Sequence, residues 1–144
     1  MVQEYEIELF KLDNATYRVL KHVNRKSFID KIANDPKRNH ERKLMFSQLN
    51  RLGSNGIDWA LRADILKRIK DNGGALPLYE LRCLPGLGRI MVYLHNGSNH
   101  RTPVLLFEFT AHKASKSVGG MREETLLKGQ QLAAKAKALM ESAA

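Results

Sequence analysis

Side chains that can bind phosphate or move protons gather in the second half of the chain. The set comprises Glu80, Arg82, Arg89, Tyr93, Glu108, His112, Lys113 and Lys116. Most of them alternate with apolar residues, and successive side chains of a strand point to opposite faces of a sheet. The alternation therefore predicts one apolar face, which helices must cover, and one open face that carries these groups. Guanidinium and ammonium groups on such a face can bind a phosphodiester.

Cleavage of RNA by its own 2′-hydroxyl is the chemistry that this set suits. The attack builds negative charge on a pentacoordinate phosphorus, which Arg82 and Arg89 can stabilise. One group must accept the proton of the 2′-hydroxyl and another must protonate the departing 5′-oxygen. Glu80, Tyr93 and His112 are the candidates for these two roles. We expect no metal and no cofactor, because the acidic residues form no cluster of the two-metal kind.

Three strands and several helices must position these groups. The strands are expected at 78–83, 89–95 and 103–110, and short turns rich in Pro, Gly and Asn join them into an antiparallel meander. The other expected elements are a strand at 4–12 and helices at 14–20, 25–34, 39–52, 57–70 and 122–142. Helices 25–34 and 39–52 would form a basic antiparallel pair. The whole chain, 1–144, is predicted to be one α+β domain, with residues 1–25 as a possible N-terminal extension that contains the opening strand.

The charge of the chain favours a polyanionic partner. Lys and Arg outnumber Asp and Glu by 24 to 15, which gives a net charge of +9 and a pI near 9.9. The stretch 21–43 is the most basic part and has three possible roles. It could hold an RNA backbone through Arg38, Arg42 and Lys43, solvate a helix pair, or bind an acidic partner protein. Its affinity for RNA would fall steeply with salt.

Several classes of protein are disfavoured by the composition. The single Cys83 excludes an internal disulfide framework. No apolar run approaches the ~18 residues of a membrane-spanning helix. The first ten residues carry Glu4, Glu6 and Glu8 where a secretory signal would be basic and then apolar. We therefore expect a cytoplasmic protein with no membrane partner.

Two segments resemble a known family. The run LYELRCLPGLGRIMVYL (78–94), followed by LLFEFTAHKASK (105–116) and a charged helix, resembles the RelE/ParE superfamily of toxins, most closely the HigB and phage Gp49-like branch. The resemblance implies a RelE-like fold, in which a small antiparallel sheet carries an N-terminal helix pair on one face and ends in a C-terminal helix. It also implies that Arg82 contacts an RNA phosphate, that Arg89 stabilises the transition state, and that Lys113 and Lys116 contact RNA or assist catalysis.

The function that the resemblance implies is that of a type II toxin. Such a protein is an endoribonuclease that cleaves mRNA on the translating ribosome, next to rRNA, and a cognate antitoxin inhibits it. Two alternatives stay open: a non-enzymatic DNA gyrase inhibitor of the ParE kind, and a basic RNA-binding module without catalysis. The presence of Arg82, Arg89 and Lys113 favours the ribonuclease, because a gyrase inhibitor has no need of them.

Overall fold

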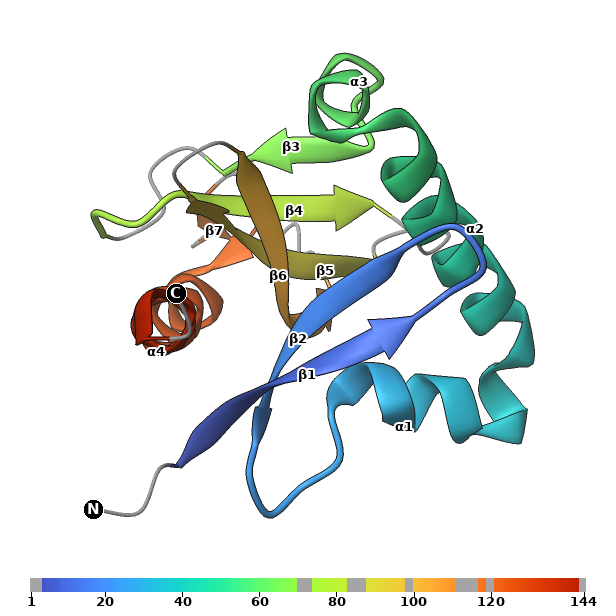
Figure 1. Cartoon of the computed structure of the whole chain (residues 1–144), viewed down its shortest axis with the longest axis horizontal. Helices are drawn as coiled ribbons and strands as arrows, with labels where there is room; N and C mark the ends of the chain where they lie inside the picture. Colours follow the sequence, from blue (N-terminus) through green and yellow to red (C-terminus); the bar gives the residue numbers. More distant parts are fainter. Residues whose placement is uncertain are drawn as a thin grey trace.

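A mixed six-stranded sheet lies at the centre of the fold (Figure 1). The structure is a computed structural model that describes residues 4–69, 74–82, 88–97, 100–110, 117–118 and 121–142. The sheet strands, in the order β1-β2-β6-β5-β4-β3, are β1 (Tyr5–Lys11), β2 (Thr16–His22), β6 (Arg101–Thr110), β5 (Gly88–Asn96), β4 (Leu78–Arg82) and β3 (Leu66–Arg68). A two-stranded ribbon pairs β7 (Ser117–Val118) with β8 (Met121–Arg122). The helices are α1 (Phe28–Asn34), α2 (Asn39–Asn55), α3 (Ile57–Arg62) and α4 (Glu123–Ser142), with a 3-10 turn, η1 (Pro36–Arg38), between α1 and α2.

The predicted α+β class, the antiparallel meander and the C-terminal helix are confirmed. Strands β4, β5 and β6 pair antiparallel in sequence order. The sheet as a whole is mixed, however, because β2 pairs parallel with β6 through Arg18 and Val104, and Val19 and Leu105. A purely antiparallel sheet was therefore the wrong prediction.

Residues 5–22 form a hairpin that belongs to the main sheet. The helix predicted at 14–20 is wrong, since these residues form most of β2. Asp13 and Asn14 make the turn, which a hydrogen bond from the Leu12 N–H to the Ala15 carbonyl closes at 2.8 Å. Turn-forming residues between two runs of strand-forming residues are typical of a hairpin. Tyr17 and Val19 of β2 are buried, so burial on the sheet outweighed the weak helical pattern.

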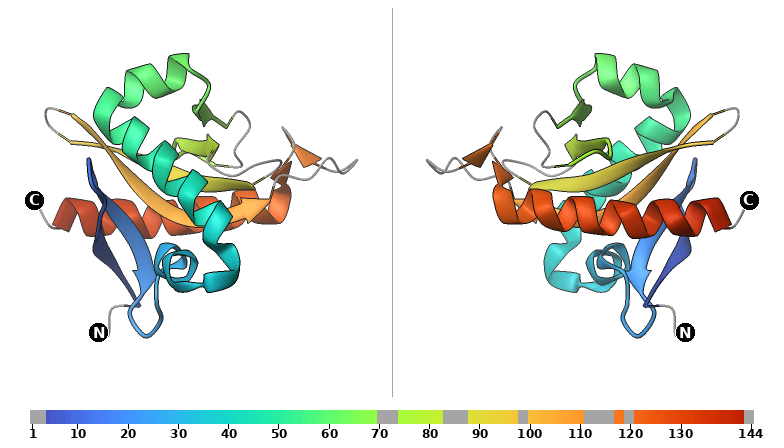
Figure 2. Two further views of the ribbon diagram at one scale, coloured as in Figure 1. Left: turned by 90° about the vertical axis from the view of Figure 1, so that its right-hand side faces the viewer. Right: turned by 90° about the vertical axis from the view of Figure 1, so that its left-hand side faces the viewer.

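Helices α1, α2 and α3 cover one face of the sheet. Ile29, Ile32, Met45 and Leu49 pack there against strand residues that include Leu81. Ser27 caps α1 by accepting a hydrogen bond from the Asp30 N–H, and the helix ends before Pro36 as predicted. Helices α1 and α2 do not form the antiparallel pair that we expected for 25–34 and 39–52. Figure 2 (left) shows α1 almost end-on while α2 lies across the view.

The helix predicted at 57–70 is correct only in its first half. Helix α3 ends at Arg62, and Asp64 adopts a positive φ of 61°. An aspartate tolerates this left-handed conformation better than most residues do. The chain then enters β3, which pairs antiparallel with β4 and buries Leu66. The helix thus ends near Asp64, and the residues after it form an edge strand although their spacing is helical.

Helix α4 covers the opposite face of the sheet (Figure 2). Its buried residues Leu126, Leu132 and Ala133 belong to a second core cluster with Leu78 and Tyr93. The expected open face is therefore covered over much of its length. The alternation of the strands did not predict this coverage, because it assigned residues with polar groups, such as Tyr93, to the open face. In the structure the Leu and Ala side chains of α4 bury Tyr93.

A surface pocket of about 520 Å³ lies between the β1–β2 hairpin and α1. Glu8 of β1, Lys21 of β2 and Asp30 of α1 line it together with residues of the connecting loop. Burial and the nearby Asp30 carboxylate raise the pKa of Glu8, which Ser27 and the Lys21 ammonium only partly offset. Folding therefore shifts the proton equilibrium of Glu8 toward the neutral carboxyl relative to the unfolded chain, and ionising Glu8 in the folded protein costs free energy.

We predict that Glu8→Gln stabilises the protein at pH 7. When folding raises the pKa of a carboxyl, the free energy of unfolding of the protein falls as the pH rises from the unfolded pKa through the folded pKa. The gain over wild type should therefore shrink as the pH falls toward the ordinary glutamate pKa of about 4.5. Denaturant unfolding between pH 4 and pH 7 measures this difference.

Glu6→Gln is the matched control, because Glu6 pairs with Lys21 at 3.0 Å and is half exposed. That change should cost at most about 1 kcal/mol, as is usual for surface ion pairs. A Glu8→Gln protein less stable than wild type at pH 7 would contradict the account of the pocket.

Candidate functional site

Three adjacent strands, β4, β5 and β6, have their ends side by side at one end of the sheet. Arg82, the last residue of β4, lies directly opposite Arg89 of β5. Arg89 in turn lies opposite Phe109 near the end of β6. The register therefore brings together the two arginines that the sequence predicts to bind phosphate.

Glu80 lies between the two arginines. Its Oε1 atom is 3.4 Å from both Nε and Nη2 of Arg82, and its Oε2 atom is 3.7 Å from Nε of Arg89. The Arg89 guanidinium also donates from Nη1 to the Gly88 carbonyl at 2.9 Å. The side chains of Glu80 and Arg89 are each 14% exposed, whereas that of Arg82 is 37% exposed. The cluster therefore combines one fixed arginine, one accessible arginine and one carboxylate, with a net charge of +1.

The end of β4 is also held from the helical side. Gln48 of α2 donates from Nε2 to the backbone carbonyl of Arg82 at 3.0 Å. This contact crosses 34 positions of sequence and fixes the strand end that carries Arg82. No spacing pattern in the sequence indicated it.

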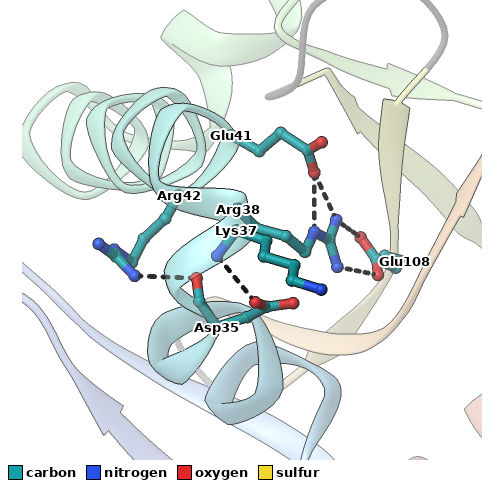
Figure 3. A network of polar contacts seen from close by, with 6 residues as sticks. All are labelled: Asp35, Lys37, Arg38, Glu41, Arg42 and Glu108. Atoms are coloured by element: carbon teal, nitrogen blue, oxygen red, sulfur yellow. Dashed lines mark hydrogen bonds and ion pairs between the residues drawn. The ribbon is translucent and has the colours of Figure 1, made fainter.

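Glu108 lies on the other face of the sheet from Arg89, contrary to the prediction. The register of β5 and β6 shifts between Met91 and Val92, so that β6 contains one extra residue. As a result Leu106 and Phe107 both join the α4 core. The alternation is reversed from Phe107 onward, which turns Glu108 toward the start of α2 (Figure 3).

Tyr93 is a core residue and not part of the arginine cluster. It is 3% exposed, and its hydroxyl is hydrogen-bonded to Nδ1 of His95 at 3.1 Å. Burial, with a smaller effect from Glu141, raises the pKa of Tyr93. It lies four positions along β5 from Arg89, which is about 13 Å. The structure therefore separates Tyr93 from the residues with which it was predicted to act.

Three further residues of the predicted site are His112, Lys113 and Lys116. They lie outside the described residues, as does Cys83. Their roles stay predictions from the sequence and from the resemblance.

The predicted RNA contacts of the basic stretch have different surroundings from one another (Figure 3). Arg38 donates two parallel hydrogen bonds to Glu108, both at 2.8 Å, and another to Glu41 at 2.8 Å. These bonds, Glu108 foremost, raise the pKa of Arg38 even further above neutral. Arg42 donates to the carbonyl of Ala33 at 3.0 Å and to the side chain of Asn39. Lys43 is exposed, whereas Arg38 and Arg42 are partly buried, so Lys43 is the most accessible of the three to a polyanion.

Two other kinds of feature are absent from the described ranges. No group of three or more His, Cys, Asp or Glu side chains in this part of the chain could hold a metal ion. Among the described helices, none is long and apolar enough to cross a membrane.

Comparison with known proteins adds no relative. No protein-family model, no curated protein and no solved structure matches the chain. The geometry of the site and the sequence resemblance therefore carry the functional argument.

We predict that Tyr93→Ala lowers the free energy of unfolding by about 3–5 kcal/mol, the usual cost of removing a large buried aromatic side chain. Tyr93→Phe should cost only about 1 kcal/mol, because it removes the hydrogen bond to His95 and keeps the packing. Urea unfolding measures both. Leu127→Ala serves as control, since Leu127 of α4 is 58% exposed. A Tyr93→Ala effect as small as that of the control would mean that α4 does not cover this face.

Proposed function

We propose that the protein is the toxin of a type II toxin–antitoxin system and acts as a metal-independent endoribonuclease on mRNA. The observation that supports this most is the pair of arginines on adjacent strands, Arg82 and Arg89, which share one carboxylate. The net charge of +9 and the resemblance to the RelE/HigB toxins favour the same function. The substrate would be mRNA in the translating ribosome, in the cytoplasm.

The contacts in the cluster are long enough for a phosphate to replace them. Strong ion-paired hydrogen bonds measure about 2.7–2.9 Å, whereas Glu80 lies 3.4–3.7 Å from the two guanidinium groups. Arg82 is the more accessible partner and would bind the incoming phosphate. Arg89 is held by the Gly88 carbonyl and would present a fixed charge to the transition state. Such preorganised donors need little rearrangement during the reaction.

The proposed reaction balances without a metal. A base takes the proton of the 2′-hydroxyl, and the oxygen attacks phosphorus to form a bond. The bond from phosphorus to the 5′-oxygen breaks, and an acid protonates that oxygen. The products are a 2′,3′-cyclic phosphate and a 5′-hydroxyl. Because Tyr93 is buried away from the arginines, Glu80 and His112 are the candidates for these proton transfers.

The charge supports the proposed RNA partners, and the resemblance implies the proposed antitoxin. Exposed Lys43 and the tail of basic residues after β6, Lys113 and Lys116, would contact the backbone of mRNA or rRNA. An antitoxin would inhibit the protein by covering the arginine cluster.

We predict that Arg89→Ala abolishes toxicity and lowers the cleavage rate by about 100- to 1,000-fold, the usual effect of removing one transition-state donor. Induced expression in a bacterium, with the ends of total mRNA mapped, measures both. The control is Arg62→Ala, which removes the same charge at the exposed end of α3 and should stay toxic.

Other outcomes would identify the alternatives. Growth arrest with intact mRNA and broken or relaxed chromosomal DNA, unchanged in Arg89→Ala, would indicate a gyrase inhibitor. RNA binding without arrest or cleavage would indicate a basic binding module. Either result would contradict the proposed function.

A further inference from the structure

We infer that Arg38 is a positioning residue that holds the end of β6 beside Arg89, and that it does not contact RNA. This inference rests on the proposed function for its effect on cleavage. Its structural part concerns the paired strands alone and can be tested without that function.

All three nitrogens of the Arg38 guanidinium are engaged with carboxylates. Nη1 and Nη2 each donate to one oxygen of Glu108 at 2.8 Å, and Nε donates to Glu41 at 2.8 Å. Nη2 also lies 2.7 Å from Glu41. A phosphate would have to break a two-pronged ion pair, which is among the strongest side-chain contacts. The short contacts of Arg38 contrast with the 3.4 Å contacts of Arg82.

The segment that carries Arg38 is itself anchored. Asp35 accepts a hydrogen bond from the Lys37 N–H at 2.9 Å, and Pro36 begins η1. Arg42 donates to the carbonyls of Ala33 and Asp35, which ties the end of α1 to the start of α2. Figure 3 shows Lys37 and Arg42 both in contact with Asp35, in the turn between the two helices. Arg38 therefore transmits the position of the helical layer to Glu108.

Among the described strands, only β5 pairs with the part of β6 that carries Glu108. Strand β2 pairs with β6 only at Val104 and Leu105. Beyond Leu105, the described part of β6 has a strand neighbour, β5, on one side only. Glu108 pairs with Ile90, and the next residue, Phe109, pairs with Arg89. The ion pair with Arg38 thus supports, from the opposite face, the backbone that carries Arg89.

Two measurements on purified protein test the effect on the site. The first is the cleavage rate on mRNA-programmed ribosomes at saturating substrate. The second is the salt dependence of binding to a single-stranded RNA oligonucleotide. Arg38→Gln and Glu108→Gln should each lower the cleavage rate about 10-fold, because small displacements of catalytic groups are costly. The double variant should be no slower than either single variant, since both changes remove one interaction.

The salt dependence separates positioning from RNA contact. Arg38→Gln should leave the slope of log affinity against log salt unchanged. Lys43→Ala is the comparison, and it should reduce the slope by about one, as the loss of a phosphate contact does. A slope reduced by about one in Arg38→Gln, with no effect of Glu108→Gln on cleavage, would overturn the inference.

Amide hydrogen exchange keeps the inference testable if wild type cleaves no RNA, in which case the proposed function fails by itself. In Glu108→Gln, the amides that bond between β5 and β6 at the Glu108 end, among Arg89, Ile90, Glu108 and Phe109, should exchange about 10-fold faster, while those at the His95–Thr102 end of the same ladder stay unchanged. Arg38→Lys, which keeps the charge but loses the two-pronged geometry, should show the same pattern. Unchanged exchange at the inter-strand amides of the Glu108 end in both variants would overturn the inference whatever the protein does to RNA.

Discussion

The pairing of β5 with β6 is the interaction on which the rest of the structure depends. Strand β6 joins the N-terminal hairpin to the meander, because it pairs with β2 on one side and with β5 on the other. The extra residue in β6 places Leu106 and Phe107 together on the α4 face, whereas Leu105, which precedes it, lies on the face of the N-terminal helices. Both faces of the sheet are thereby buried over its middle. The charged cluster of Glu80, Arg82 and Arg89 lies at one end of the strands.

At that end, two arginine clusters on opposite faces differ in how tightly they are held. Arg38 makes short, two-pronged contacts with Glu108 in the layer between helices and sheet. Arg82 and Arg89 share Glu80 through contacts of 3.4–3.7 Å. The tight cluster suits a structural role and the loose one suits exchange of a carboxylate for a phosphate. A basic residue count alone does not distinguish these two roles, but the geometry of the partners does.

The sequence predicted those parts of the fold in which the pattern is local. The meander, α1, α2 and α4 follow from alternation, helical spacing and turn residues, and so does the meeting of Arg82 with Arg89. The bulge in β6 left no local signal, so Glu108 was assigned to the wrong face. Coverage of Tyr93 by α4 and the bond between Arg38 and Glu108, which are 70 positions apart, depend on tertiary packing. These long-range contacts are the ones that sequence patterns do not encode.

The chemistry of the cleaved ends tests the central claim most directly. Purified protein would be incubated with mRNA-programmed ribosomes, and the chemical groups at the new RNA ends would be identified. A parallel reaction would use a message that carries a single 2′-deoxy nucleotide at the cleavage position. Attack by the 2′-hydroxyl on a phosphate held by Arg82 and Arg89 predicts 5′-hydroxyl and 2′,3′-cyclic phosphate ends, and no cleavage of the 2′-deoxy message. Ends with a 5′-phosphate, or cleavage that persists in the 2′-deoxy message, would contradict the account.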